Sequence, residues 1–306
     1  MRPIEILLSL ANLLAFVSLI IPLSPALPWM RYAAFISLII AVLQGVVEGA
    51  RWQMVPAYLL ALVFCLIALA GNVTPNALHV NRVFAGIGVG LAVLGILVSI
   101  VLPIVLPVFH FPKPTGPYAI GTTTYHWVDT DRPELFTTDP NDQRELMAQV
   151  WYPAKDEPSA PRAPYIQDAE SITPALARLT HLPVFLFSHF KYVTTNAVAD
   201  APVAQDQAQY PVLIFLSGLN GFRQMNMFQI EELVSQGYII VGLAQPGAVA
   251  LVHFPDVHDV SGLPRDLMYP LIQQSVEPLP TTPTLFGKAL PDGIVPYFAA
   301  DVPFTL

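Results

Sequence analysis

The residues that could do chemistry gather in one stretch, Tyr210–Gln245, whose pattern predicts a strand, a glycine loop, a helix and a second strand. In open α/β sheets, functional groups usually lie on the loop that follows a strand. Here that loop begins with Ser217, a serine between a strand and a helix, as a nucleophilic serine would be. Phe215 argues against this role, because such an elbow needs a small residue two positions earlier, and no acid–base partner can be assigned.

Two other groups of side chains were considered as sites. His253, Asp256, His258 and Asp259 lie within seven positions, and two imidazoles with two carboxylates can bind a metal. We favour a solvated loop here, with no metal and no cofactor. Adjacent acids in the predicted helix, at positions 231 and 232, point to different helix sides, so we expect solvation rather than a paired-carboxylate site.

The charges are unevenly distributed along the chain. Charged residues make up only 12% of the sequence and hydrophobic residues 54%, against roughly 25% charged residues in an ordinary soluble domain. Six charged residues precede position 110, with a net charge of +2, and the other 30 follow it, with a net charge of −10, which gives −8 in total. The acidic second part would repel a phosphate backbone, so nucleic acid is not an expected partner.

The first 110 residues predict a membrane anchor. They contain four apolar runs, Ile4–Ile21, Tyr32–Val47, Met54–Ala70 and Val83–Phe109. About 20 apolar residues span a bilayer as a helix, so we expect a four-helix transmembrane anchor in a cell membrane, with lipid as its partner. A cleaved signal peptide is the alternative for the first run, but three further runs argue against it. Three basic residues would lie on one side of the membrane and two on the other. This difference is too small for the positive-inside rule to decide the orientation of the anchor.

The remaining residues, 111–306, are enough for one domain. A proline-rich linker, Phe109–Tyr118, precedes two predicted strands, Ile120–Val128 and Glu145–Tyr152, which we expect to form an antiparallel hairpin at the edge of the sheet. The continuous apolar run Val212–Leu216 predicts a strand that is buried on both faces.

The other parts of this domain are less regular. Residues 158–209 indicate an insertion over one face of the sheet, with a short helix after Ser171 as its cap. In the helix of the opening motif, Met227, Ile230 and Val234 share one face, and Gly237 ends it. Residues 246–306 predict no helix longer than a turn or two, except a possible helix that begins near Val295.

Several segments resemble the platelet-activating-factor acetylhydrolase group of α/β-hydrolases, particularly its bacterial members. The resemblance rests on their order as well as on their residues: P-T-G-P-Y-A-I-G at 114–121, R-E-L-M-A-Q-V-W-Y-P-A at 144–154, Y-P-V-L-I-F-L-S-G-L-N-G-F-R at 210–223 and G-Y-I-I-V-G-L at 237–243. The four-span anchor is not part of the general family pattern.

The resemblance implies a serine–histidine–aspartate triad that cleaves acyl esters. The family's serine lies in a Gly-x-Ser-x-Gly elbow, and this sequence contains no such pattern. In the family the elbow and the other triad residues come later, so the sequence reads as C-terminally truncated. The oxyanion-hole amide of the family corresponds to the backbone N–H of Leu219. Ser217 stands where many members of the family have His or Pro, and Asn220 stands where they have Gly. Asparagine tolerates left-handed backbone angles, so the loop can keep its shape.

We therefore expect a four-helix transmembrane anchor over residues 1–110, followed by an incomplete α/β-hydrolase domain over residues 111–306. Its sheet should be open and mostly parallel, with an antiparallel N-terminal edge. The expected function is hydrolysis of acyl esters of phospholipid-like substrates, with the nucleophile region missing from this chain. The alternative is a catalytically inactive, membrane-anchored binding or structural protein with a remnant hydrolase domain.

Overall fold

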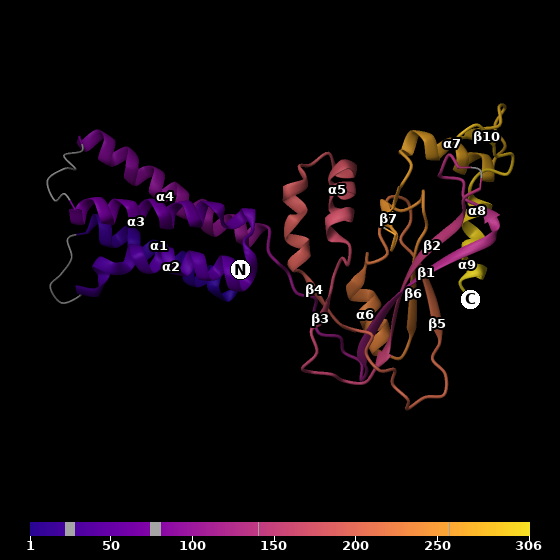
Figure 1. The fold of residues 1–306 in the computed structure, drawn as a ribbon, viewed down its shortest axis with the longest axis horizontal. Helices are drawn as coiled ribbons and strands as arrows, with labels where there is room; N and C mark the ends of the chain where they lie inside the picture. The colour runs from indigo at the N-terminus through magenta and orange to yellow at the C-terminus, as the bar shows by residue number, and fades with distance from the viewer. Residues whose placement is uncertain (22–27, 74–80, 140, 257) are drawn as a thin grey trace. The chain divides into compact units, whose positions relative to one another are not determined.

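A computed structural model describes residues 1–21, 28–73, 81–139, 141–256 and 258–306. The described chain divides into two compact units, Met1–Phe109 and His110–Leu306 (Figure 1). Each unit has its own hydrophobic clusters and is described separately.

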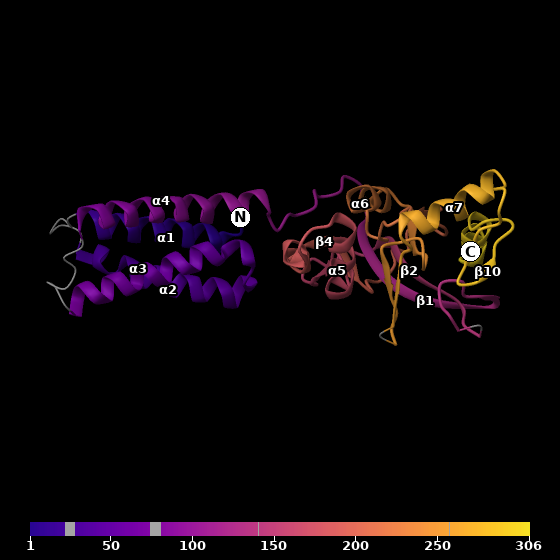
Figure 2. The same ribbon diagram turned by 90° about the horizontal axis from the view of Figure 1, so that it is seen from above.

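The first unit is a bundle of four long helices. They are α1 (Pro3–Ile20), α2 (Ala33–Gln44), α3 (Val55–Val73) and α4 (Arg82–Val105), with short turns at Pro28–Tyr32, Gly45–Gly49 and Trp52–Met54. Figures 1 and 2 both show the helices side by side along their length. Four segments, Pro3–Ile20, Trp29–Gly49, Trp52–Ala70 and Arg82–Val105, are long and apolar enough to cross a membrane. Parts of two expected connections, at residues 22–27 and 74–80, lie outside the described residues.

Buried ionic groups join the helices at one end of this bundle. Both carboxylate oxygens of Glu5 on α1 accept hydrogen bonds from Arg51, each at 2.7 Å, and both side chains are almost fully buried. Nη1 of Arg51 also donates to the carbonyl of Leu106, at the end of α4, at 2.8 Å. Arg2 donates to Glu5 as well, and Glu48 accepts from the N–H of Ile4 at 2.8 Å. A buried ion pair with its remaining donors satisfied holds the helix ends in one register.

The second unit is built on a six-stranded sheet. Its strands are β1 (Ala119–Pro133), β2 (Gln143–Ala154), β3 (Arg162–Pro164), β4 (Thr194–Ala199), β5 (Val212–Leu216) and β6 (Ile239–Ala244). The helical segments along it are α5 (Ala169–Thr180), η4 (Val184–Tyr192) and α6 (Met227–Ser235). Beyond β6 come β7 (Leu251–His253), β8 (Asp259–Ser261), α7 (Arg265–Val276), β9 (Thr284–Leu285), β10 (Lys288–Ala289), α8 (Val295–Ala299) and α9 (Asp301–Phe304).

The sheet is mixed rather than mostly parallel. Its order is β3-β4-β1-β2-β6-β5, and only the pairs β4–β1 and β6–β5 are parallel. The expected antiparallel hairpin forms between β1 and β2, but it lies inside the sheet because β3 and β4 extend the sheet beyond it. Residues 158–209 thus supply two strands as well as covering elements, and the expectation of an N-terminal sheet edge was wrong.

β5 lies at an edge of the sheet, which corrects the expectation of burial on both faces. Val212, Leu213 and Leu216 are 47%, 41% and 46% exposed. Only β6 pairs with β5 among the described strands, in parallel register with Leu213 opposite Ile240. The apolar sequence of β5 predicts a buried strand. Whether the strand is buried depends on which other segments pack beside it, and its own sequence does not reveal them.

The helix α6 packs on the sheet as its sequence predicts. Met227, Ile230 and Val234 are at most 3% exposed, and they join Trp151 of β2 and Ile240 of β6 in one cluster. The cap of α5 is Asp168 rather than Ser171, and the helix starts two residues before that serine. The 12-residue helix α7 shows that the expectation of no long helix after position 245 was wrong.

A buried ionic cluster fixes the last helices to the sheet. Arg144 on β2 is fully buried and lies 2.7 Å from a carboxylate oxygen of Asp301 on α9 and 3.0 Å from one of Glu134. Gln245 donates to the same Asp301 carboxylate at 2.8 Å. The guanidinium of Arg144 lies 4.8 Å from the ring centre of Tyr297. Two carboxylates and an aromatic face therefore compensate the desolvation of this cation.

Candidate functional site

The loop after β5 has the backbone shape that its glycine and asparagine allow. Gly218 and Asn220 both have left-handed backbone angles, with φ of +75° and +58°. The N–H of Asn220 donates to the carbonyl of Ala248 at 2.7 Å, and the N–H of Ala250 donates to the carbonyl of Gly221 at 2.8 Å. A Cβ at Gly221 would lie 2.6 Å from the carbonyl oxygen of Ser217, so no side chain fits there. The segment after β6 therefore holds the loop in one conformation.

Leu219 lies at the exposed crest of this loop. Its side chain is 42% exposed, and within the described ranges its backbone N–H donates to no acceptor. The next two amides of the turn, those of Asn220 and Gly221, both donate to carbonyl groups. A free amide beside two fixed ones is suited to a negative oxygen, because it needs no rearrangement before it donates.

Ser217 does not have the surroundings of a nucleophile. Its hydroxyl oxygen is buried and has no hydrogen-bond partner in the described part of the chain. Nδ1 of His253 instead lies 2.6 Å from Asp259, and Nδ1 of His258 lies 2.5 Å from Asp256. The structure therefore gives this serine no base that would take its proton.

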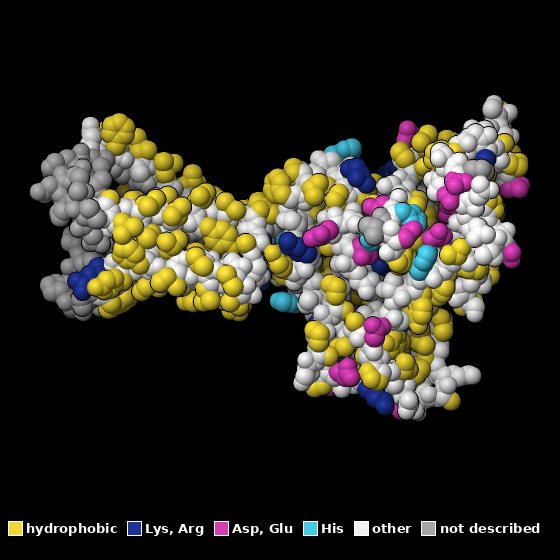
Figure 3. All heavy atoms as spheres, in the orientation of Figure 1, with side chains coloured by type: hydrophobic (Ala, Val, Ile, Leu, Met, Phe, Trp, Pro, Cys, Tyr) yellow, Lys and Arg dark blue, Asp and Glu magenta, His cyan; other side chains and the backbone are white. Residues whose placement is uncertain are grey.

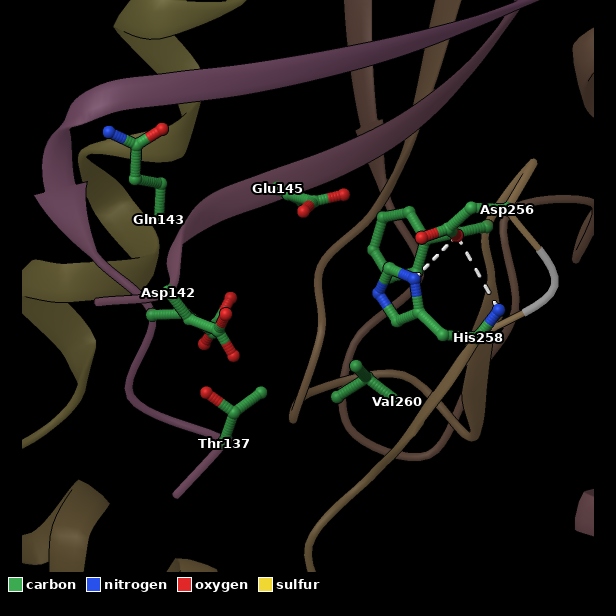
Figure 4. A pocket seen from close by; sticks show the side chains of 9 residues that line it. Thr137, Asp142, Gln143, Glu145, Asp256, His258 and Val260 are labelled. Carbon is green, nitrogen blue, oxygen red and sulfur yellow. Dashed lines mark hydrogen bonds and ion pairs between the residues drawn. The ribbon is translucent and has the colours of Figure 1, made fainter. Parts of the chain in front are cut away.

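The two histidines form separate pairs rather than one cluster. His258 and Asp256 line a cavity of about 270 Å³, and Figure 4 shows them facing Asp142 and Thr137 across it. Two further carboxylates of this cavity are already engaged, since Glu134 accepts from Arg144 and Glu145 lies 2.6 Å from His126. Among the described residues, no three His, Cys, Asp or Glu side chains are grouped so that they could hold a metal ion.

Arg223, which sequence reasoning left without a role, lies at the start of the segment after the loop. Its side chain is 3% exposed and lines a cavity of about 420 Å³ together with Gln167 and Asp168. Its Nη2 makes two long hydrogen bonds, at 3.3 Å to Gln167 and 3.4 Å to Asp168, and its Nε has no partner in the described ranges. Burial lowers the pKa of this guanidinium, and the carboxylate of Asp168 opposes the shift.

The two acids of α6 differ, and the expectation that both are solvated was wrong for Glu231. Its carboxylate is fully buried and accepts from the backbone N–H and the Nδ2 of Asn196, at 2.5 and 2.7 Å. Burial raises the pKa of Glu231 above its ordinary value, although the two hydrogen bonds oppose this. The carboxylate of Glu232 accepts from the side chain and backbone of Thr115, which lowers its pKa. Glu232 thus ties the linker to α6.

Comparison with known proteins relates the second unit to a hydrolase family. The sequence model of the family described as platelet-activating factor acetylhydrolase, isoform II, matches residues 104–250. No curated protein matches this chain. Among solved structures, the ferulic acid esterase from Streptomyces cinnamoneus is 24% identical, with a TM-score of 0.41. The match covers 56% of this chain and 47% of the esterase, so this chain spans about half the length of that protein.

The matched residues contain β1, β2, β5, the loop at Leu219, α6 and β6, which are the segments that carry the sequence resemblance. The match ends within the segment that fixes this loop, at Ala250. Residues 104–250 therefore match the platelet-activating factor acetylhydrolase family, which supports the family resemblance that the sequence indicates.

Proposed function

We propose that this chain forms the oxyanion-binding half of a membrane-anchored serine esterase that cleaves acyl esters of phospholipid-like substrates. In this reaction the serine oxygen attacks the ester carbonyl, and the carbonyl oxygen becomes negatively charged. The free N–H of Leu219 would donate to that oxygen, together with a second amide from the nucleophile segment. The four apolar helices support a substrate met at a bilayer, and the reaction needs no metal.

One observation carries this proposal, namely the edge of β5 with which no described strand pairs, directly before the Leu219 loop. The strand has the apolar composition of a buried strand, yet three of its five side chains are more than 40% exposed. A further strand on this edge would cover them, and its C-terminal end would lie beside the loop at Leu219, provided that it runs parallel to β5. We propose that this missing strand brings the Gly-x-Ser-x-Gly serine, with the histidine and aspartate following it.

The test uses the protein made from its whole reading frame, beside residues 1–306 alone. We expect the former to hydrolyse p-nitrophenyl acetate and the latter to show no hydrolysis above buffer. In the active protein, Leu219→Pro removes the donor and should lower kcat by about 10²–10³. Leu219→Ala, which keeps the N–H, is the matched control. Hydrolysis by residues 1–306 that Ser217→Ala abolishes would overturn the proposal.

A second candidate function is a non-catalytic binding or structural module. The buried cluster of Arg144, Asp301 and Glu134 favours it, because this cluster fixes the last helices to the sheet without a further strand. This function predicts a second unit that resists proteases and stays monomeric. The esterase proposal instead predicts that the open edge of β5 makes the chain associate with itself.

A further inference from the structure

Among the described residues, three arginine side chains are buried, and that of Arg223 differs from the other two in its partners. Arg51 donates to both carboxylate oxygens of Glu5 at 2.7 Å, and Arg144 lies 2.7 and 3.0 Å from two carboxylates. Within the same ranges, Arg223 pairs with one carboxylate, that of Asp168, at 3.4 Å. A charge-assisted hydrogen bond is normally about 2.7–2.9 Å long, so this pair compensates the desolvation of Arg223 only weakly.

The guanidinium of Arg223 also has donors without acceptors. Both of its hydrogen bonds come from Nη2, and Nε has no partner in the described part of the chain. One of the two acceptors, Oε1 of Gln167, lies closer to the hydroxyl of Thr124, at 2.8 Å, than to Arg223, at 3.3 Å. Buried polar groups of native proteins almost always have a hydrogen-bond partner, so these donors indicate an acceptor that enters from outside the chain.

Arg223 lines a cavity of a size that suits a small organic molecule. Its volume of about 420 Å³ lies within the range of ligand sites. Met147 of β2 and Phe254, which are 6% and 1% exposed, form an apolar part of the cavity wall. Arg223, Gln167 and Asp168 form a polar part. Ligand sites typically combine such an apolar wall with a few polar groups that fix the orientation of the ligand.

The first turn of α5 lies beside the same cavity. A second cavity, of about 400 Å³, is lined by Ala169, Glu170 and Lys191, and it shares Gln167 and Asp168 with the first. In the described part of the chain, no acceptor takes the N–H of Ala169 or Glu170, and the side chain of Asp168, the N-cap, makes no capping hydrogen bond. Free N–H groups and the helix dipole both favour an anion at this position.

The charges around the two cavities favour a ligand with a single negative charge. Arg223 and Lys191 are opposed by Asp168 and Glu170, so there is no surplus of cations for a dianion such as phosphate. Figure 3 shows acidic and histidine side chains gathered on the face of the second unit around β7, which further disfavours a multiply charged anion. A carboxylate carries one charge, and its two oxygens match the planar fork of a guanidinium.

We propose that the cavity at Arg223 binds a small organic carboxylate, with its two oxygens on the guanidinium and its apolar part against Met147 and Phe254. Asp168, whose side chain is 30% exposed, lies in the place of the ligand's carboxylate and turns toward solvent when the ligand binds. The ligand then gives Arg223 the short, two-oxygen contact that Asp168 does not give. All groups of this site belong to the second unit, and the site does not depend on the ester cleavage proposed above.

The experiment uses the full chain in detergent, with trifluorobutyrate as the probe. Binding is measured by fluorine NMR as the increase in the transverse relaxation rate of the probe, after subtraction of the effect of empty micelles. The uncharged amide of the same acid has the same apolar part and is the matched control ligand. We expect the carboxylate to bind at least about ten-fold more tightly, because it alone makes charge-assisted hydrogen bonds. Equal binding of the two probes, or binding of neither, would overturn the inference.

Variants of the two paired residues should change the binding of trifluorobutyrate in opposite directions. Arg223→Gln removes the cation and should abolish binding. Asp168→Asn removes the competing carboxylate and should strengthen binding several-fold. Arg178→Gln and Asp156→Asn, which remove exposed charges outside both cavities, should leave it unchanged.

Asp168→Asn decides the outcome even if Arg223→Gln does not fold, which circular dichroism checks. If Asp168 is only the structural partner of Arg223, Asp168→Asn lowers the midpoint of thermal unfolding and does not strengthen binding. That result contradicts a carboxylate site.

Competition separates a carboxylate site from a general anion site. At equal ionic strength, acetate should displace the probe at a concentration at least about ten-fold lower than inorganic phosphate does. Phosphate that displaces the probe as readily as acetate would show general anion binding, and the assignment to carboxylates would then be wrong.

Discussion

At the scale of single residues, Asn220 shows how a departure from a family motif can preserve the shape of a loop. An asparagine replaces a glycine, and its φ of +58° lies in the left-handed region that asparagine tolerates better than other side chains do. The sequence indicates this conformation, because the residue type itself carries the preference. The same reasoning does not extend to Arg223 or Glu231, whose burial comes from distant segments of the chain.

The neighbouring acids of α6 should respond to pH in opposite directions. The raised pKa of Glu231 means that its contribution to stability is full below its unfolded pKa of about 4.3 and is lost as the pH rises through its folded pKa. The lowered pKa of Glu232 means that its contribution is present above the unfolded pKa and is lost as the pH falls.

We therefore expect the free energy of unfolding of Glu231→Gln, relative to that of the unchanged chain, to rise between about pH 4 and pH 8. For Glu232→Gln, the same difference should instead change at acid pH, and it should rise as the pH falls from about 5 to about 3. Urea unfolding of the full chain in detergent, followed by circular dichroism, measures both. The two variants alter adjacent positions of one helix and serve as controls for each other, so a change in the same direction with rising pH in both would refute the assignment.

At the scale of elements, the periodicity of apolar residues predicts those strands and helices whose formation depends on local sequence. The alternation in β2 and the shared face of Met227, Ile230 and Val234 gave the correct hairpin and helix. The short strands β3 and β4 were not predicted, because three- and six-residue segments carry too little pattern; β4 pairs with the distant β1, and β3 pairs with β4. The edge position of β5 could not be predicted either, because no local pattern says whether a neighbour exists.

The open edge of β5 should make the chain associate with itself. Unpaired strand edges add strands from other molecules, and a charged side chain on the edge opposes this. Leu213→Lys should reduce the associated fraction in light scattering of the full chain in detergent. Leu267→Lys places the same charge at an exposed leucine of α7, away from any strand, and should change little. Equal effects of the two variants would point to general repulsion rather than to strand pairing.

At the scale of the whole molecule, the sequence predicts four apolar helices but not their orientation. The small excess of basic residues on one side of the anchor is even weaker evidence for its orientation once the ion pairs of the structure are considered. The three basic residues on that side are Arg2, Arg51 and Lys113, and the first two of them form ion pairs with Glu5 and Glu48. Neutralised in this way, they are weak signals for the positive-inside rule.

An even number of spans nevertheless places both ends of the anchor on one side of a membrane. In a Cys65→Ala background, Ala50→Cys and Asp156→Cys should react with a membrane-impermeant maleimide added to the same side. Asn81→Cys should react only from the opposite side. Unchanged Cys65, buried in α3, is the unreactive control. Labelling of Ala50→Cys and Asn81→Cys from the same side would contradict four spans.

The buried pair of Arg144 and Asp301 also has a consequence for synthesis. The two residues are 157 positions apart, so Arg144 leaves the ribosome long before its main partner exists. At 5–20 residues per second, the interval is about 8–30 s. During that time β2 carries a cation that cannot yet be buried at low cost. The buried cation of β2 therefore receives its partner on α9 only late in synthesis, after translation has passed Asp301.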